Sequence, residues 1–180
     1  MKDFDAFNQI EHGAHLYQFY KTIDDYVASL GIFFRTGLNK GEACIWLVDE
    51  AMGLRSVQQF AEKIIPNLLL YLCTGQMTIL SANEWYLTGG NFDEEKAVAN
   101  AQNFIQKTLE KGYSGIRGAG DAAAIPKMQR HKLEPYEARM NQFIKELPLI
   151  GVCAYPIDDC TLSEVRMVIE HHDHRMLSCH

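Results

Sequence analysis

Carboxylates and aromatic side chains follow the short apolar runs of this sequence. Such a set could bind a small polar or weakly apolar molecule, because it combines hydrogen-bonding groups with flat apolar faces and holds few receptors for an anion. The groups after the successive runs are Tyr20 and Lys21, Asp49 and Glu50, Asn83, Glu84, Trp85 and Tyr86, Gly118, Gly120 and Asp121, and Tyr155, Asp158 and Asp159. The plainer interpretation, in which strand ends simply carry solvated polar residues, stays open.

Histidines and cysteines offer a second kind of chemistry. His15, just before two aromatic residues of the first apolar run, is a candidate for a buried functional histidine, with a hydrogen-bonded core histidine as the alternative. Cys153 lies within an apolar run and is expected to be inert packing. We find no local nucleophile motif, and we therefore expect neither enzymatic activity nor a cofactor.

The C-terminal region holds a cluster of residues that commonly bind metals. Its members are His171, His172, His174, Cys179 and His180. Their spacing could hold a divalent ion on a fraying helix, but chain ends are usually poorly ordered. We therefore expect no physiological metal there, and the three histidines up to His174 stay weak candidates.

A nucleotide site lacks its phosphate loop. The sequence has no Gly-x-x-x-x-Gly-Lys-Ser/Thr run, and Lys21-Thr22 follows the first apolar run without glycines to cradle a phosphate. Gly118-Ala-Gly120-Asp-Ala-Ala123 matches a dinucleotide pattern in form, but it places a carboxylate where the pyrophosphate would lie and meets Pro126 before any helix. We expect Gly118 and Gly120 to serve a tight turn from strand to loop.

Alternating strands and helices must position these groups. Strands are predicted at His15–Tyr20, Cys44–Val48, Met77–Leu80, Tyr113–Arg117 and Leu149–Tyr155. Helices are predicted from Ile23 to Gly41, Leu54 to Ile64, Asp93 to Gly112, Tyr136 to Leu147, and from Thr161 onward. The alternation predicts an α/β fold, a three-layer sandwich with a mostly parallel central sheet. In such sheets ligands bind beyond the carboxyl ends of the strands.

Length and charge limit the class of protein. The 180 residues carry 17 basic and 23 acidic side chains, for a net charge of −6, and 47% of them are hydrophobic. These values are typical of one globular domain spanning 1–180, and the acidic balance argues against direct binding of nucleic acid. Scattered cysteines without a signal peptide indicate free thiols in the cytoplasm. No apolar run approaches the roughly 20 residues of a membrane span.

Several motifs together resemble one known family. They are His15-Leu-Tyr-Gln-Phe-Tyr20, Lys40-Gly-Glu-Ala-Cys-Ile-Trp46, Glu84-Trp-Tyr-Leu87, Gly112-Tyr-Ser-Gly-Ile-Arg117, Tyr136-Glu137 and Cys153-Ala-Tyr155. With them the chain resembles the MEDS domain, a methanogen and methylotroph sensory domain, over a core of about 12–172. The resemblance implies a RecA/KaiC-like fold without the phosphate loop and a role in sensing small hydrocarbon derivatives.

The resemblance also selects site residues and leaves questions open. It implies that Glu137 joins His15, Tyr20, Glu50, Glu84, Trp85, Tyr86, Asp121 and Tyr155 in binding the ligand. Asp121-Ala-Ala-Ala departs from the family, which often has a glutamate followed by Met-Ser/Thr-Trp. MEDS domains usually adjoin a helix-turn-helix or kinase module, for which 180 residues leave no room. We therefore expect a stand-alone sensor that signals through a protein partner or by self-association.

Two other functions stay open as alternatives. The first is a degenerate RecA-like nucleotide-binding protein, in which Glu50 and Asp121 remain from the acid and magnesium positions. The second is a ligand-free interaction module that binds a partner protein through helix faces and the basic stretch from Lys127 to Arg139.

Overall fold

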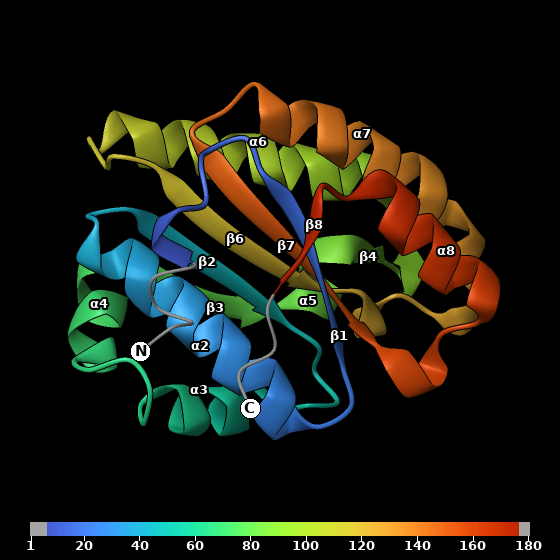
Figure 1. The fold of residues 1–180 in the computed structure, drawn as a ribbon, viewed down its shortest axis with the longest axis horizontal. Helices are drawn as coiled ribbons and strands as arrows, with labels where there is room; N and C mark the ends of the chain where they lie inside the picture. The colour runs from blue at the N-terminus through green and yellow to red at the C-terminus, as the bar shows by residue number, and fades with distance from the viewer. Residues whose placement is uncertain (1–6, 177–180) are drawn as a thin grey trace.

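Six parallel strands form the central sheet of the computed structural model, which describes residues 7–176 (Figure 1). Their order across the sheet is β3-β2-β6-β7-β1-β8. The bounds are β1 His15–Tyr20, β2 Ala43–Val48, β3 Met77–Ser81, β6 Ile116–Asp121, β7 Leu149–Pro156 and β8 His174–Arg175. A separate antiparallel hairpin pairs β4 (Leu87–Thr88) with β5 (Asn91–Phe92).

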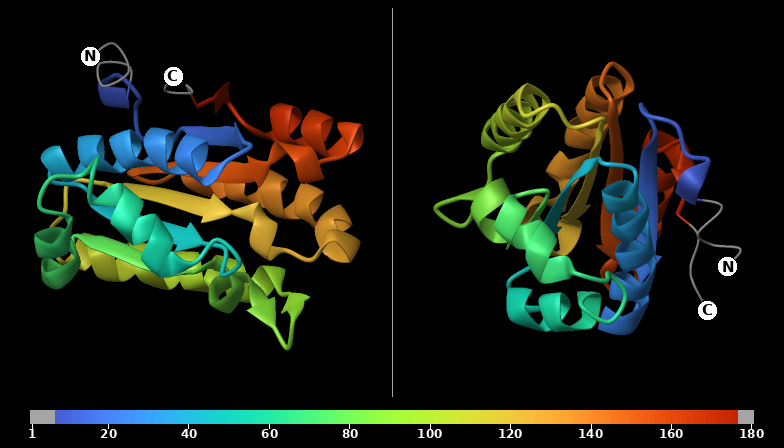
Figure 2. Two further views of the ribbon diagram at one scale, coloured as in Figure 1. Left: turned by 90° about the horizontal axis from the view of Figure 1, so that it is seen from below. Right: turned by 90° about the vertical axis from the view of Figure 1, so that its left-hand side faces the viewer.

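Helices cover both faces of this sheet. In the view of Figure 1, α6 (Glu94–Glu110) and α7 (Leu133–Lys145) lie along its upper side, and α2 (Ile23–Asn39) and α3 (Leu54–Ala61) along its lower side. The smaller helices are α4 (Leu68–Thr74), α5 (Ala82–Tyr86) and α8 (Leu162–His171). Two separate hydrophobic cores result, one shared with α2 to α4 and one with α5 to α8. The expected three-layer sandwich is therefore confirmed, and the side views of Figure 2 show the layers.

Local sequence explains most of these elements. Every residue of β2 is buried, as expected for a strand covered on both faces. Thr22 and Thr161 begin α2 and α8 with capping boxes, and Asp93 caps α6. The alternation of side chains then decides which core each strand residue joins: Leu16 and Tyr20 face α2, whereas Tyr17 faces α7 and α8.

The strand β6 differs from the sequence-based expectation. It begins at Ile116 and continues to Asp121, so Gly118 and Gly120 lie inside the strand and the turn expected at them is wrong. Both glycines are held by parallel neighbours, β2 on one side and β7 on the other. Tertiary pairing thus overrides the low strand preference of glycine. A glycine inside a strand often marks the close approach of another group.

Several short elements were not predicted. They are α4, α5, the β4–β5 hairpin and the edge strand β8. All have ten residues or fewer, and α5 has only five, so their sequences show too little periodicity to be recognised. Among residues 7–176, no helix is long and apolar enough to cross a membrane.

Candidate functional site

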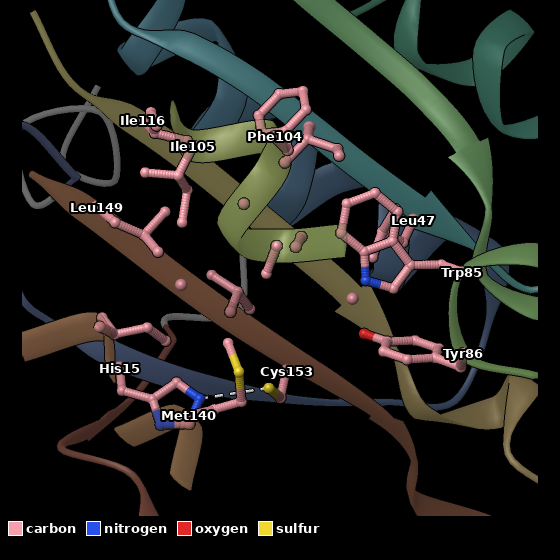
Figure 3. Close-up of a pocket in the computed structure, with 18 of the residues that line it drawn as sticks. His15, Leu47, Trp85, Tyr86, Phe104, Ile105, Ile116, Met140, Leu149 and Cys153 are labelled. Carbon is pink, nitrogen blue, oxygen red and sulfur yellow. Dashed lines mark hydrogen bonds between the residues drawn. The ribbon is translucent and has the colours of Figure 1, made fainter. Parts of the chain in front are cut away.

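An apolar cavity of about 80 Å³ lies between the sheet and the helices α5, α6 and α7 (Figure 3). Its floor is formed by β2, β6 and β7, on the face of the sheet that packs against α5 to α8. Its walls are mainly aliphatic and aromatic: Ile45, Leu47, Trp85, Phe104, Ile105, Ile116, Met140, Ile144 and Leu149. The polar groups at it include the Tyr86 hydroxyl, the Cys153 thiol and the His15 ring, and Figure 3 places the last two together at one end.

Glycines on neighbouring strands create this space. Gly118 of β6 lies directly opposite Gly151 of β7, and Gly120 lies opposite Cys153. A Cβ atom on Gly118 would lie 3.5 Å from the Ile45 side chain and 3.8 Å from that of Leu149, so a methyl group fits above Gly118 in ordinary van der Waals contact. At Gly120, a Cβ atom would collide with the Tyr86 hydroxyl. The glycines therefore leave a hollow in the sheet face and admit Tyr86 to its edge.

The short helix α5 brings Trp85 and Tyr86 to the cavity. Its first turn is capped by Ser81, whose hydroxyl accepts a hydrogen bond from the Glu84 backbone N–H (3.0 Å) and donates one to Glu50 Oε1 (2.6 Å). At its other end, the Asn100 amide donates to the Trp85 carbonyl (3.1 Å). Glu50 and Glu84 are exposed and do not line the cavity. They were predicted to bind ligand, but the observed role of Glu50 is to hold Ser81.

A buried polar cluster adjoins the same cavity. It comprises His15, Glu137, Cys153, Tyr155 and His172, and the Glu137 carboxylate is at its centre. Glu137 accepts hydrogen bonds from the Tyr155 hydroxyl (2.5 Å) and the Cys153 thiol (3.4 Å). The ring nitrogens His15 Nε2 and His172 Nε2 lie 3.6 and 3.5 Å from Glu137 Oε2. Parallel pairing of β1 with β7 brings His15 beside Gly151 and so onto this face.

Burial controls the protonation of this cluster. Desolvation, and then the neighbouring His172, lower the pKa of His15 to about 2, so its ring is neutral near pH 7. Desolvation and the Glu137 carboxylate raise the pKa of the Cys153 thiol and of the Tyr155 hydroxyl well above their usual values. Cys153 therefore keeps its proton and is a poor nucleophile, because the thiolate is the reactive form.

Tyr20 and Asp121 form a second, separate group. The Tyr20 hydroxyl donates to both carboxylate oxygens of Asp121 (3.0 and 3.1 Å), and both residues are buried. Desolvation raises the pKa of Asp121 to about 7, and Asp49 adds to the rise. Tyr20 packs into the core that faces α2, whereas Tyr155 packs into the other core. The sheet therefore separates two groups that were expected to share one rim.

The predicted C-terminal metal candidates are also divided. His172 stacks on His15, with ring centroids 4.0 Å apart, and belongs to the polar cluster. His174 is exposed in β8, and His171 Nε2 lies 3.9 Å from Glu134 Oε1. Cys179 and His180 lie outside the described residues. Sequence spacing missed the contribution of His172 because its partners lie far away along the chain.

The start of α2 is unsuited to a phosphate. Only Lys21 and Thr22 separate β1 from α2, and the Thr22 side chain already caps the helix by accepting from the Asp25 N–H (3.1 Å). Asp24 and Asp25 add negative charge to the first turn, which disfavours an anion. This geometry argues against the nucleotide-binding alternative.

The basic stretch from Lys127 to Arg139 is largely paired within the chain. Lys127 Nζ contacts Asp159 (2.6 Å), and Arg139 contacts Glu95 (2.7 Å). Arg130 is buried and donates to the Asp159 carbonyl (3.0 Å). These contacts argue against a basic docking surface here.

Comparison with known proteins places this geometry in a family and a fold. The family model described as the methanogen/methylotroph, DcmR sensory domain, MEDS, matches residues 14–173. Among solved structures, the chain is similar to the flagellar accessory protein FlaH from Methanocaldococcus jannaschii, with a TM-score of 0.50 and 10% identity, over 94% of this chain and 74% of that one. This likeness supports the expected RecA/KaiC-like fold. No protein of curated function matches the sequence.

Proposed function

The chain belongs to the MEDS family of sensory domains, and from this premise we propose that it senses a small hydrocarbon derivative bound in the apolar cavity. Family membership supports the sensory role. The observation that carries the choice of site is the hollow above Gly118, which the strand pairing of β6 and β7 builds into the sheet. The ligand would therefore bind on the face of the sheet, between it and α5 to α7.

The size and lining of the cavity favour a one-carbon or short-chain compound. An engineered apolar cavity of about 150 Å³ holds benzene, and a water molecule occupies about 30 Å³ of liquid. At about 80 Å³, this cavity has room for only a few heavy atoms. Its walls favour an apolar body. The Cys153, His15 and Tyr86 side chains can recognise one polar or halogen substituent.

Binding can produce a signal through α5. This helix has five residues, and Trp85 in its last turn is half-buried at the cavity. A ligand that contacts Trp85 would favour conformations in which α5 is closed over the cavity. We propose that a protein partner or a second copy of the chain reads this change, and that the domain binds its ligand without transforming it.

A screen of small volatile compounds tests the proposal. Calorimetry and thermal-shift measurements would use dichloromethane, methanol, ethanol and methylamine. We expect at least one to bind wild-type protein and a Met128→Ala control, whose exposed side chain lies outside the cavity, but to bind Trp85→Ala much more weakly. Absence of any response at millimolar ligand, or equal binding by Trp85→Ala, would contradict the proposal.

Light scattering with and without the ligand tests the output by self-association. A ligand-dependent change in mass would identify a second copy as the reader. An unchanged mass would leave a different protein as the partner. ATP serves as the comparison ligand, since micromolar ATP binding would favour the degenerate nucleotide-binding alternative.

A further inference from the structure

Four side chains of the buried polar cluster have the arrangement of a metal-binding site. His15, Glu137, Cys153 and His172 each offer one ligand atom, and these atoms all lie within 4.8 Å of one another. For a tetrahedral ion with bonds of about 2.0 to 2.3 Å, neighbouring ligand atoms are roughly 3.3 to 3.8 Å apart. Four of the observed separations match this range: Nε2 of His15 to Sγ of Cys153 (3.3 Å), Sγ to Oε2 of Glu137 (3.4 Å), and Oε2 to Nε2 of His172 (3.5 Å) and of His15 (3.6 Å).

The hydrogen bonding of His172 leaves an unfilled position. Its Nδ1 lies 2.6 Å from the Val168 carbonyl oxygen, which can only accept, so Nδ1 carries the proton. The other ring nitrogen, Nε2, faces the Glu137 carboxylate at 3.5 Å. Nε2 is buried and has no hydrogen-bond partner among the described residues. A cation between them would satisfy both the buried Nε2 and the carboxylate oxygen that faces it.

We propose that His15, Glu137, Cys153 and His172 bind one divalent transition-metal ion, with Zn²⁺ as the best match. Imidazole, thiolate and carboxylate ligands in a tetrahedral arrangement are characteristic of Zn²⁺, whereas Mg²⁺ and Ca²⁺ prefer oxygen ligands. Binding would release the Cys153 proton, because the thiolate is the ligand. The sequence shows no motif for this site, since its residues come from β1, α7, β7 and the end of α8.

Surrounding groups already orient the proposed ligands. The Tyr155 hydroxyl holds Glu137 by its other oxygen, Oε1, at 2.5 Å. The Val168 carbonyl fixes the His172 ring. Such partners of metal ligands commonly set ring orientation and metal affinity. The cavity borders His15 and Cys153, two of the four proposed ligands.

A catalytic Cys–His pair is a weaker explanation of the same contacts. In such a pair, a third group hydrogen-bonds to the histidine nitrogen that faces away from the thiol. Within residues 7–176, His15 Nδ1 has no hydrogen-bonding side chain beside it, and Glu137 lies on the Nε2 side together with Cys153. The carboxylate is therefore placed as a fellow ligand and not as an orienting acid.

Metal binding by the full-length chain tests the proposal. Chelator-treated protein would be titrated with Zn²⁺ and, separately, with Co²⁺, whose absorption reports tetrahedral geometry and thiolate ligation. We expect one equivalent per chain and a thiolate-to-cobalt band. Cys153→Ala should lose the band, and His172→Ala should weaken binding at least tenfold. Tyr155→Phe, which keeps every ligand, should weaken binding about 10- to 100-fold.

Matched controls separate this site from incidental binding. Cys160→Ala removes a half-buried thiol outside the cluster, and His174→Ala removes an exposed neighbouring histidine. Both should bind Zn²⁺ like wild type. Three results would overturn the proposal: a cobalt band retained in Cys153→Ala, binding lost in His174→Ala, or absence of stoichiometric binding. The close contact of His172 with Glu137 would then be explained by a proton shared between them. If Cys153→Ala does not fold, Tyr155→Phe and X-ray absorption of wild type still decide the ligand set.

The metal site stands independently of the proposed sensory ligand. Gly118→Ala fills part of the cavity without touching the four ligands, so it should weaken small-molecule binding and leave one equivalent of Zn²⁺ bound. A protein that responds to small molecules but fails to bind Zn²⁺ would refute only the metal site.

Discussion

Adding one methyl group at Gly118 should stabilise the protein while weakening ligand binding. The new Cβ atom would meet Ile45 at 3.5 Å and Leu149 at 3.8 Å, which are ordinary van der Waals contacts. The methyl group fills about 30 Å³, near the volume of a water molecule, out of a cavity of about 80 Å³. At about 24 cal/mol per Å³ of cavity, this filling stabilises the fold by roughly 0.7 kcal/mol. Restricting the unfolded chain adds about 0.4 to 1 kcal/mol.

The total gain in unfolding free energy for Gly118→Ala is therefore about 1 to 2 kcal/mol, to be measured by urea denaturation. Loss of room for one heavy atom removes up to about 1.5 kcal/mol of binding free energy, so calorimetry should show ligand binding weakened by up to roughly tenfold. Gly120→Ala is the matched contrast on the same strand, because its Cβ atom collides with Tyr86. The Gly120→Ala substitution should lower the free energy of unfolding by about 1 to 3 kcal/mol. A destabilised Gly118→Ala, or one with unchanged ligand affinity, would refute the account of the cavity.

Three further substitutions test other parts of the structure. Folding raises the pKa of Asp121 to about 7, so the stability that its protonated form contributes is complete below the pKa of the unfolded chain and is lost as pH rises toward 7. In urea titrations between about pH 5 and pH 8, wild type should lose about 2 to 3 kcal/mol of unfolding free energy relative to Asp121→Asn. Parallel pH profiles of the two proteins would count against this. Trp85→Phe should abolish the ligand-induced fluorescence change, since Trp46 lies in the other core; a persisting change would place the ligand elsewhere. Arg117→Met should lower the unfolding free energy by about 3 to 5 kcal/mol, because it leaves the buried Glu42 carboxylate without its 2.5 Å partner. Adding Glu42→Leu should restore most of the lost stability. A double variant no more stable than the single one would contradict this expectation.

The sequence was sufficient to predict the layers of the fold. The helix face of α2 and the buried run of β2 carry strong periodic or continuous apolar patterns, and β1 was placed at its observed bounds. The boundaries of β6 were missed, because Gly118 and Gly120 look like turn residues until neighbouring strands hold them. Pairing across a sheet depends on residues far away in the chain, which local preference does not report.

The candidate site was predicted only in part, for a related reason. Trp85 and Tyr86 do line the cavity, and His15 lies between it and the polar cluster. Tyr20 and Asp121 occupy the opposite face, because side-chain direction alternates along each strand and the site had been assigned from strand ends alone. Cys153 was expected to be inert, and its raised pKa agrees with this; its place at the cavity was not predicted, although it lies two residues after Gly151 in β7 and so faces the same side. The same alternation, applied to the sequence of this strand, would have indicated that Cys153 and Gly151 face the same side of the sheet.

A crystal structure with a bound ligand would show whether small molecules bind in the apolar cavity. Crystals of the full chain exposed to bromoethane, a short-chain halide with a strong anomalous scatterer, would show where the molecule binds. We expect a bromine peak inside the cavity, between Gly118, Trp85 and Cys153, in wild type and a much weaker peak in Gly118→Ala. Bromine found only on the surface, or equally in both proteins, would contradict it.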